Sequence, residues 1–115
     1  MEIQDRTLKF TIRTAKLVRK ISIDISFDIL AKQLLRSASS IGANMWEADS
    51  ASSRKDFINK VLIAKKEAQE TEYWLEVIKG AEFINNEENK KELEKLLLEC
   101  REIILILAAI VRKAK

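Results

Sequence analysis

The chain has 115 residues, no proline, two glycines, no histidine, one cysteine and a net charge of +3. This length fits a single domain over residues 1–115, and the scarcity of turn-forming residues favours a few long helices. Without histidine, the chain lacks the commonest general base and the commonest transition-metal ligand. A single cysteine excludes an internal disulfide and a cysteine metal site. We therefore expect a non-enzymatic protein with no catalytic residue, no metal and no cofactor.

The hydropathy of the chain predicts no membrane segment. Its longest apolar run, Ile103 to Val111, is far shorter than the roughly 20 residues that cross a bilayer. The first residues also lack the apolar core of a signal peptide. We therefore expect a cytoplasmic protein with no membrane partner.

Helical periodicity predicts a first helix from about Asp5 to Ile21. Its expected inward face comprises Leu8, Ile12, Ala15 and Val18, within a wider apolar arc that also takes in Phe10, Leu17 and Ile21. Residues 22–26 break the pattern. Asp24 or Ser26 can cap the next helix, because either side chain can accept a hydrogen bond from a free amide of the first turn.

The second helix is expected from about Phe27 to Ala51. Its core face comprises Leu30, Leu34, Ala38, Ile41 and Met45, with Ala31, Gly42 and Trp46 beside them. Ser53 and Asp56 then form a start that is similar to a capping box. The third helix carries an apolar seam at spacings of 4 and 3, which is typical of near-parallel packing: Phe57, Val61, Ala64, Ala68, Thr71, Leu75 and Ile78.

The fourth helix is expected from about Asn86, with Asn85 and Glu88 as a candidate cap. Its inward residues are Leu93, Leu97, Cys100, Ile104, Leu107 and Val111. Short connections between four amphipathic helices predict an all-α fold, an antiparallel up-down four-helix bundle.

Five basic residues of the first helix recur at spacings of 3, 4, 3 and 4, which places them on one stripe: Arg6, Lys9, Arg13, Lys16 and Lys20. Residues 1–21 carry a net charge of +4, whereas the rest of the chain sums to −1. Such a stripe can neutralise phosphates, but no aromatic residue is interleaved to stack on bases. We interpret it as a candidate nucleic-acid-binding surface. The alternative, a merely solvated charged face, is at least as common.

Some apolar residues fall outside the predicted core faces: Ile63, Trp74, Leu98, Leu105 and Ala109. Extended apolar patches are rare on monomers, so these residues favour an oligomer interface over a monomer with a wide core. The second helix adds a stripe of mostly small polar residues about 130° from its core side: Gln33, Ser37, Ser40, Asn44 and Glu47. Small hydroxyl and amide groups permit close helix approach and fix register, so this stripe is a second candidate interface; an ordinary wet surface is the alternative.

Residues 30–78 resemble the four-helix-bundle family encoded in intervening sequences of bacterial 23S ribosomal RNA genes. The accessory protein of diversity-generating retroelements is similar to this family. The matching residues include Gln33, Leu34, Arg36, Ala38, Ser40, Ile41, Ala43, Asn44 and Glu47, then Lys55-Asp56-Phe57, Lys66-Glu67, and Glu70-Thr71-x-Tyr73-Trp74-Leu75. Ala48 departs from the glycine that usually follows the glutamate in this family.

The resemblance implies a ring-like homopentamer. It also implies RNA or DNA and a reverse transcriptase as partners if the chain belongs to the retroelement branch, whose member binds both through a basic surface. The members encoded in ribosomal RNA genes have no firmly established biochemical role. Two expectations therefore remain open: an oligomeric bundle that binds nucleic acid through its first helix, and a scaffold ring that does not.

Overall fold

The computed structural model describes residues 2–21 and 24–115. Within them it contains four helices and no strand: α1 (Glu2–Lys20), α2 (Ile25–Ala48), α3 (Arg54–Gly80) and α4 (Glu87–Ala114). The all-α, four-helix prediction is confirmed. The helix α1 begins before the predicted Asp5, and α2 ends before the predicted Ala51. Residues 22–23 of the predicted break lie outside the described part of the chain.

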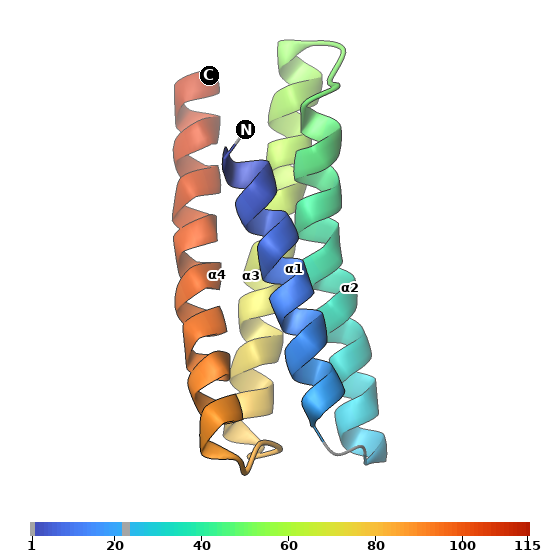
Figure 1. Ribbon diagram of the computed structural model, residues 1–115. Helices are drawn as coiled ribbons and strands as arrows, with labels where there is room; N and C mark the ends of the chain where they lie inside the picture. The colour runs from blue at the N-terminus through green and yellow to red at the C-terminus, as the bar shows by residue number, and fades with distance from the viewer. Residues whose placement is uncertain (1, 22–23) are drawn as a thin grey trace.

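The four helices lie side by side in a bundle whose extents are 45 × 22 × 19 Å (Figure 1). Each helix packs against its neighbour in the chain, and α4 packs against α1 to complete the circuit. Over the described ranges, the diagonal pairs α1–α3 and α2–α4 make no close backbone approach. The bundle therefore has four seams between neighbouring helices, and each seam has an outer surface.

Polar side chains cap three of the helices. The Asp24 carboxylate accepts a hydrogen bond from the Phe27 amide at 2.9 Å, so Asp24 and not Ser26 caps α2. The Ser53 hydroxyl accepts one from the Asp56 amide at 3.0 Å, as the capping pattern predicted for α3. The cap of α4 is Asn86, one residue after the predicted Asn85.

The core consists mainly of the predicted faces of α2, α3 and α4. Most of the expected inward residues are buried, among them Leu34, Ile41, Met45, Val61, Leu75, Leu97 and Leu107. Leu96 and Ile103 also lie in the core, so the buried face of α4 is wider than predicted. Leu30, Phe57 and Ile104 are partly buried at its edge. Trp46, expected beside the core, is 64% exposed.

The predicted inward face of α1 is wrong at Leu8, Ile12 and Ala15, whereas the wider arc of Phe10, Leu17 and Ile21 is buried and Val18 is partly buried against the core. Leu8 and Ile12 are 41% and 44% exposed, and Ala15 is also exposed. The buried face comprises Ile3, Gln4, Thr7, Phe10, Thr14, Leu17 and Ile21.

The threonines explain this reversal of α1. The hydroxyl of Thr7 donates to the carbonyl of Gln4 at 3.0 Å, and that of Thr14 donates to the carbonyl of Phe10 at 2.8 Å. A threonine that satisfies its hydroxyl within its own helix can enter a core at little cost. The side that carries Phe10 and Leu17 can therefore be buried, even though it also carries polar residues.

Candidate functional site

The two arginines of the predicted basic stripe face α4 and are engaged in ion pairs. Arg6 donates from Nε and Nη2 to the two carboxylate oxygens of Glu99, at 3.0 and 2.6 Å. Arg13 makes the same two-point contact with Glu92, at 3.1 and 2.9 Å. Both pairs are partly buried, and two-point pairs of this kind hold a specific geometry. We call these two pairs the α1–α4 clasp.

The electrostatics of the α1–α4 clasp keep both guanidinium groups charged. The hydrogen bond to Glu99 raises the pKa of Arg6, and burial opposes that effect only in part. The hydrogen bond to Glu92 raises the pKa of Arg13 in the same way. Two of the five stripe residues are therefore already neutralised by acidic residues of the same chain.

The lysines of the stripe are more accessible. Lys9 is exposed and pairs with Asp5 one turn earlier, at 2.9 Å. Lys16 and Lys20 are exposed and form no ion pair with any side chain that the structure describes. Lys20 lines a groove of about 330 Å³ together with residues of the first turns of α4: Glu88, Asn89, Lys91, Glu92 and Lys95. This end of the bundle collects lysines from two helices, which can contact phosphates through charge alone.

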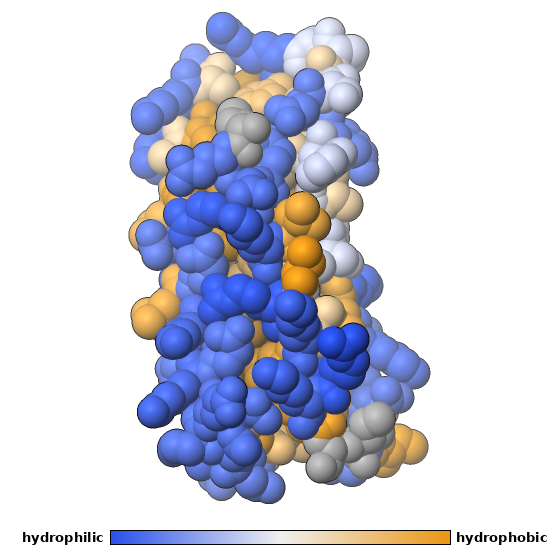
Figure 2. Space-filling view, in the orientation of Figure 1, coloured by the Kyte–Doolittle hydropathy of each residue, from blue (hydrophilic) through white to orange (hydrophobic). Residues whose placement is uncertain are grey.

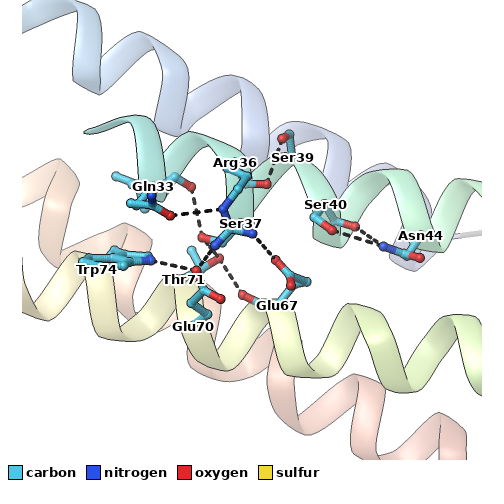
Figure 3. A network of polar contacts seen from close by, with 11 residues as sticks. Gln33, Arg36, Ser37, Ser39, Ser40, Asn44, Glu67, Glu70, Thr71 and Trp74 are labelled. Atoms are coloured by element: carbon cyan, nitrogen blue, oxygen red, sulfur yellow. Dashed lines mark hydrogen bonds and ion pairs between the residues drawn. The ribbon is translucent and has the colours of Figure 1, made fainter. Parts of the chain in front are cut away.

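The polar stripe of α2 lies along the seam with α3 (Figure 3). Ser37 is fully buried, and its Oγ accepts a hydrogen bond from the hydroxyl of Thr71 on α3 at 2.8 Å. Its side chain therefore closes a contact within the chain and does not lie on an outer face. The side-chain amide of Asn44 donates to the backbone carbonyl of Ser40 at 2.8 Å and to its hydroxyl at 3.2 Å, so these two residues are bonded to each other within α2.

The ends of the same stripe take part in contacts near or across this seam. Gln33 accepts a hydrogen bond from Arg36 Nε at 3.1 Å, and Glu47 pairs with Lys60 of α3 at 2.8 Å. The stripe thus contributes to the α2–α3 contact of a single copy. Gln33, Ser40 and Asn44 remain partly accessible, and Glu47 is exposed.

Arg36 is a central residue of this seam that the sequence analysis did not assign. It pairs with Glu67 at 3.1 Å and with Glu70 (Figure 3), and Trp74 donates from its indole to the same Glu70 carboxylate at 3.0 Å. Trp74 is consequently half-buried beside α2. Its exposed neighbour Tyr73 stacks edge-on against it, with ring centres 5.0 Å apart. Contacts between helices leave no periodic signal in one sequence, although every residue named in this paragraph is among those that match the family.

The apolar interface candidates Leu98 and Leu105 are 61% and 68% exposed on α4, and Ile63 is also exposed on α3. The structure adds an apolar surface that the sequence analysis missed, between α1 and α2. A groove of about 200 Å³ there is lined by Leu8, Thr11, Ser39, Gly42, Ala43 and Trp46. We call it the α1–α2 groove. Figure 2 shows apolar side chains along this seam, beside the charged side chains of α1.

The one thiol of the sequence is not set up as a nucleophile. Cys100 lies in the core and donates from Sγ to the carbonyl of Ala68 at 3.2 Å. Burial raises the pKa of its thiol to about 12, which disfavours the reactive thiolate. Over residues 2–21 and 24–115, no three potential ligand side chains gather closely enough to hold a metal ion. Nor is any helix in this part of the chain long and apolar enough to span a bilayer.

Comparisons with known proteins identify a family and a similar solved structure. The family model of the 23S rRNA-intervening sequence protein matches residues 1–109. A solved structure of a protein of unknown function, from the S23 ribosomal protein family of Bacteroides thetaiotaomicron, is 39% identical, with a TM-score of 0.80. The similarity covers 95% of this chain and 97% of that one. No curated protein matches the chain.

The α1–α4 clasp predicts a measurable coupling between Arg13 and Glu92. In a double-mutant cycle with Arg13→Ala and Glu92→Ala, urea unfolding should give a coupling energy of about 0.5–1 kcal/mol, because the pair is two-pointed and partly buried. The coupling should shrink in 1 M salt. A cycle on the exposed Asp5–Lys9 pair is the control and should give a smaller value. Equal coupling energies in both cycles would mean that the Arg13–Glu92 pair stabilises the fold no more than an exposed pair does.

The buried thiol of Cys100 predicts low reactivity in the folded protein. With the pKa raised to about 12, Ellman's reagent at pH 8 should react at least about 100-fold more slowly with the folded chain than with the chain in urea. The thiol of the unfolded chain loses its proton at a lower pH than the thiol of the folded chain. The free energy of unfolding should therefore fall as the pH rises from 9.0 towards about 12. The Cys100→Ala variant should lack this part of the pH dependence. Similar rates in the folded and unfolded states would contradict the assignment.

Proposed function

The chain belongs to the 23S rRNA-intervening sequence protein family, and on that basis we propose that it is a non-enzymatic helical bundle that assembles into a ring of identical copies. One observation supports the proposal: ten large apolar side chains of the described residues are exposed, and five of them lie on two separate parts of the surface. These are Leu8, Ile12 and Trp46 on one part, and Leu98 and Leu105 on the other. Burial of such side chains is the main driving force of association, at roughly 25 cal/mol per Å² of apolar surface.

The chemistry of the side chains supports a non-enzymatic role. The sequence has no histidine, and its one thiol is buried with a raised pKa. The strongest polar clusters, the α1–α4 clasp and the contacts around Arg36, pair charges with each other and leave no activated group. These clusters stabilise helix contacts, which is the expected use of charge in an assembly module.

Light scattering tests the assembly directly. We propose five copies, the number that the family resemblance implies, so the expected mass is about five times the 13.2 kDa of one chain. A single species at 13.2 kDa at micromolar concentration would contradict the proposal.

A second candidate function is contact of the ring with nucleic acid through lysines. The observation that favours it is that Lys20 of α1 lines one groove with Lys91 and Lys95 of α4, beside Glu88 and Glu92, and that Lys16 is exposed one turn earlier on α1. Each copy would contribute a weak, sequence-independent contact, and a ring would repeat it, which raises the apparent affinity. The engagement of Arg6 and Arg13 in the clasp counts against it and favours the scaffold alternative.

Titration with RNA and with DNA at two salt concentrations separates these functions. If lysines bind phosphates, Lys16→Glu with Lys20→Glu should lower the affinity about tenfold or more and reduce its salt dependence. The matched control is Lys113→Glu with Lys115→Glu, which makes the same charge change in the last residues of the chain, beyond the far end of the α1–α4 seam. No binding at low salt, or equal losses in both variants, would leave the scaffold ring as the function.

A further inference from the structure

We propose that the α1–α2 groove of one copy receives the outer face of α4 of the next copy, with Leu98 and Leu105 as the inserted residues. This inference rests on the proposed assembly and specifies its two surfaces. It identifies the partner of the groove as a second copy of the chain.

The lining of the α1–α2 groove suits a row of side chains from another helix. Its middle is formed by small residues, Ser39, Gly42 and Ala43, and Leu8 and Trp46 flank them. A Cβ added at Gly42 would meet its nearest atoms only at 3.6 Å, so the helices are not in steric conflict beneath the groove. Small residues between larger apolar ones permit the close approach of another helix.

The seam beneath the groove also differs in charge from the other seams. Ion pairs cross the α1–α4 seam, the α2–α3 seam and the α3–α4 seam, as in Arg13–Glu92, Arg36–Glu67 and Arg101–Glu72. Among the described side chains, none crosses from α1 to α2. A partner that docks on this seam therefore breaks no ion pair that joins α1 to α2, which makes association less costly.

The outer face of α4 carries the matching ridge. Leu98 and Leu105 are two turns apart, about 10 Å along the helix, and so lie on one stripe. The neighbouring residues Leu97, Cys100 and Leu107 are buried in the core, which directs this stripe outward. On α1, Leu8 and Ala15 have the same spacing of seven residues with Ile12 between them, so the two surfaces repeat with the same period.

The exposed apolar area of the two surfaces is comparable to that buried in a specific protein–protein interface. Five of the ten exposed large apolar side chains belong to these two surfaces, and they are between 41% and 68% exposed: Leu8, Ile12, Trp46, Leu98 and Leu105. Together they expose roughly 500–600 Å², which is over half of the apolar area in a standard interface of about 1,600 Å². The surrounding small and polar residues would supply the remainder.

The geometry is head-to-tail, because the groove and the ridge are different surfaces of one chain. In an open chain of copies, such a contact leaves a free groove at one end and a free ridge at the other until the chain closes into a ring. An isologous dimer, in which the same surface meets itself, would instead leave the second surface unused.

Complementation of two variants tests this arrangement. Trp46→Glu disrupts the groove only, and Leu98→Glu with Leu105→Glu disrupts the ridge only; all three residues are exposed, so the bundle should remain folded. Each variant alone should be a 13.2 kDa monomer by light scattering. An equimolar mixture should form a heterodimer of twice that mass and nothing larger, because only one intact groove and one intact ridge can meet.

Several outcomes would overturn the inference. Assembly of either variant alone as the wild type does, or no heterodimer in the mixture, would exclude this pair of surfaces. The control is Ile25→Glu, which places the same charge on an exposed apolar residue outside both surfaces and should leave assembly unchanged. Circular dichroism checks folding, and Trp46→Gln and Leu105→Gln replace any glutamate variant that loses helicity. A monomeric wild-type chain would contradict the proposed function itself.

Discussion

A four-helix bundle can bury only one stripe of each helix, and this constraint decides which side chains remain for other uses. In this chain the buried stripe of α1 is the one that contains Phe10 and Leu17, with threonines that bond within their own helix. That choice leaves Leu8 and Ile12 outside, next to Trp46 of α2. It also turns Arg6 and Arg13 towards the glutamates of α4. The orientation of one helix thus sets both the apolar surface and the charge pattern.

The orientation of α1 determines which residues of its basic stripe are available to a ligand. Arg6 and Arg13 are cross-links between helices, and their glutamate partners cancel much of the charge that a nucleic acid would meet. The exposed lysines, Lys16 and Lys20, lie towards the end of the helix, where Lys91 and Lys95 of α4 are near Lys20. The two arginines of the stripe therefore join α1 to α4, and its exposed lysines without an ion pair to any described side chain, Lys16 and Lys20, lie in the last turns of α1.

The sequence was sufficient to predict four helices, the capping function of Ser53 and most of the core, because each depends on local hydrogen bonds or on the helical period. It was not sufficient to orient α1, whose two sides both carry apolar residues. The hydrogen bonds of the threonine hydroxyls depend on side-chain rotamers, which the sequence does not reveal. The ion pairs with Glu92 and Glu99 join residues far apart in the chain, so helical spacing does not reveal them either. For the same reason the pairing of Arg36 with Glu67, and the burial of Ser37 against Thr71, could not be anticipated from spacing.

The central claim is that the α1–α2 groove is covered in the assembled protein. Trp46 reports on it directly, because its indole is 64% exposed in the single copy and belongs to the groove. In a Trp74→Phe background, Trp46 is the only tryptophan, and acrylamide quenching of its fluorescence can be followed as the protein is diluted. The account predicts weak quenching in assembled protein and strong quenching as the copies dissociate. Strong quenching at every concentration, while light scattering still records the assembly, would contradict it.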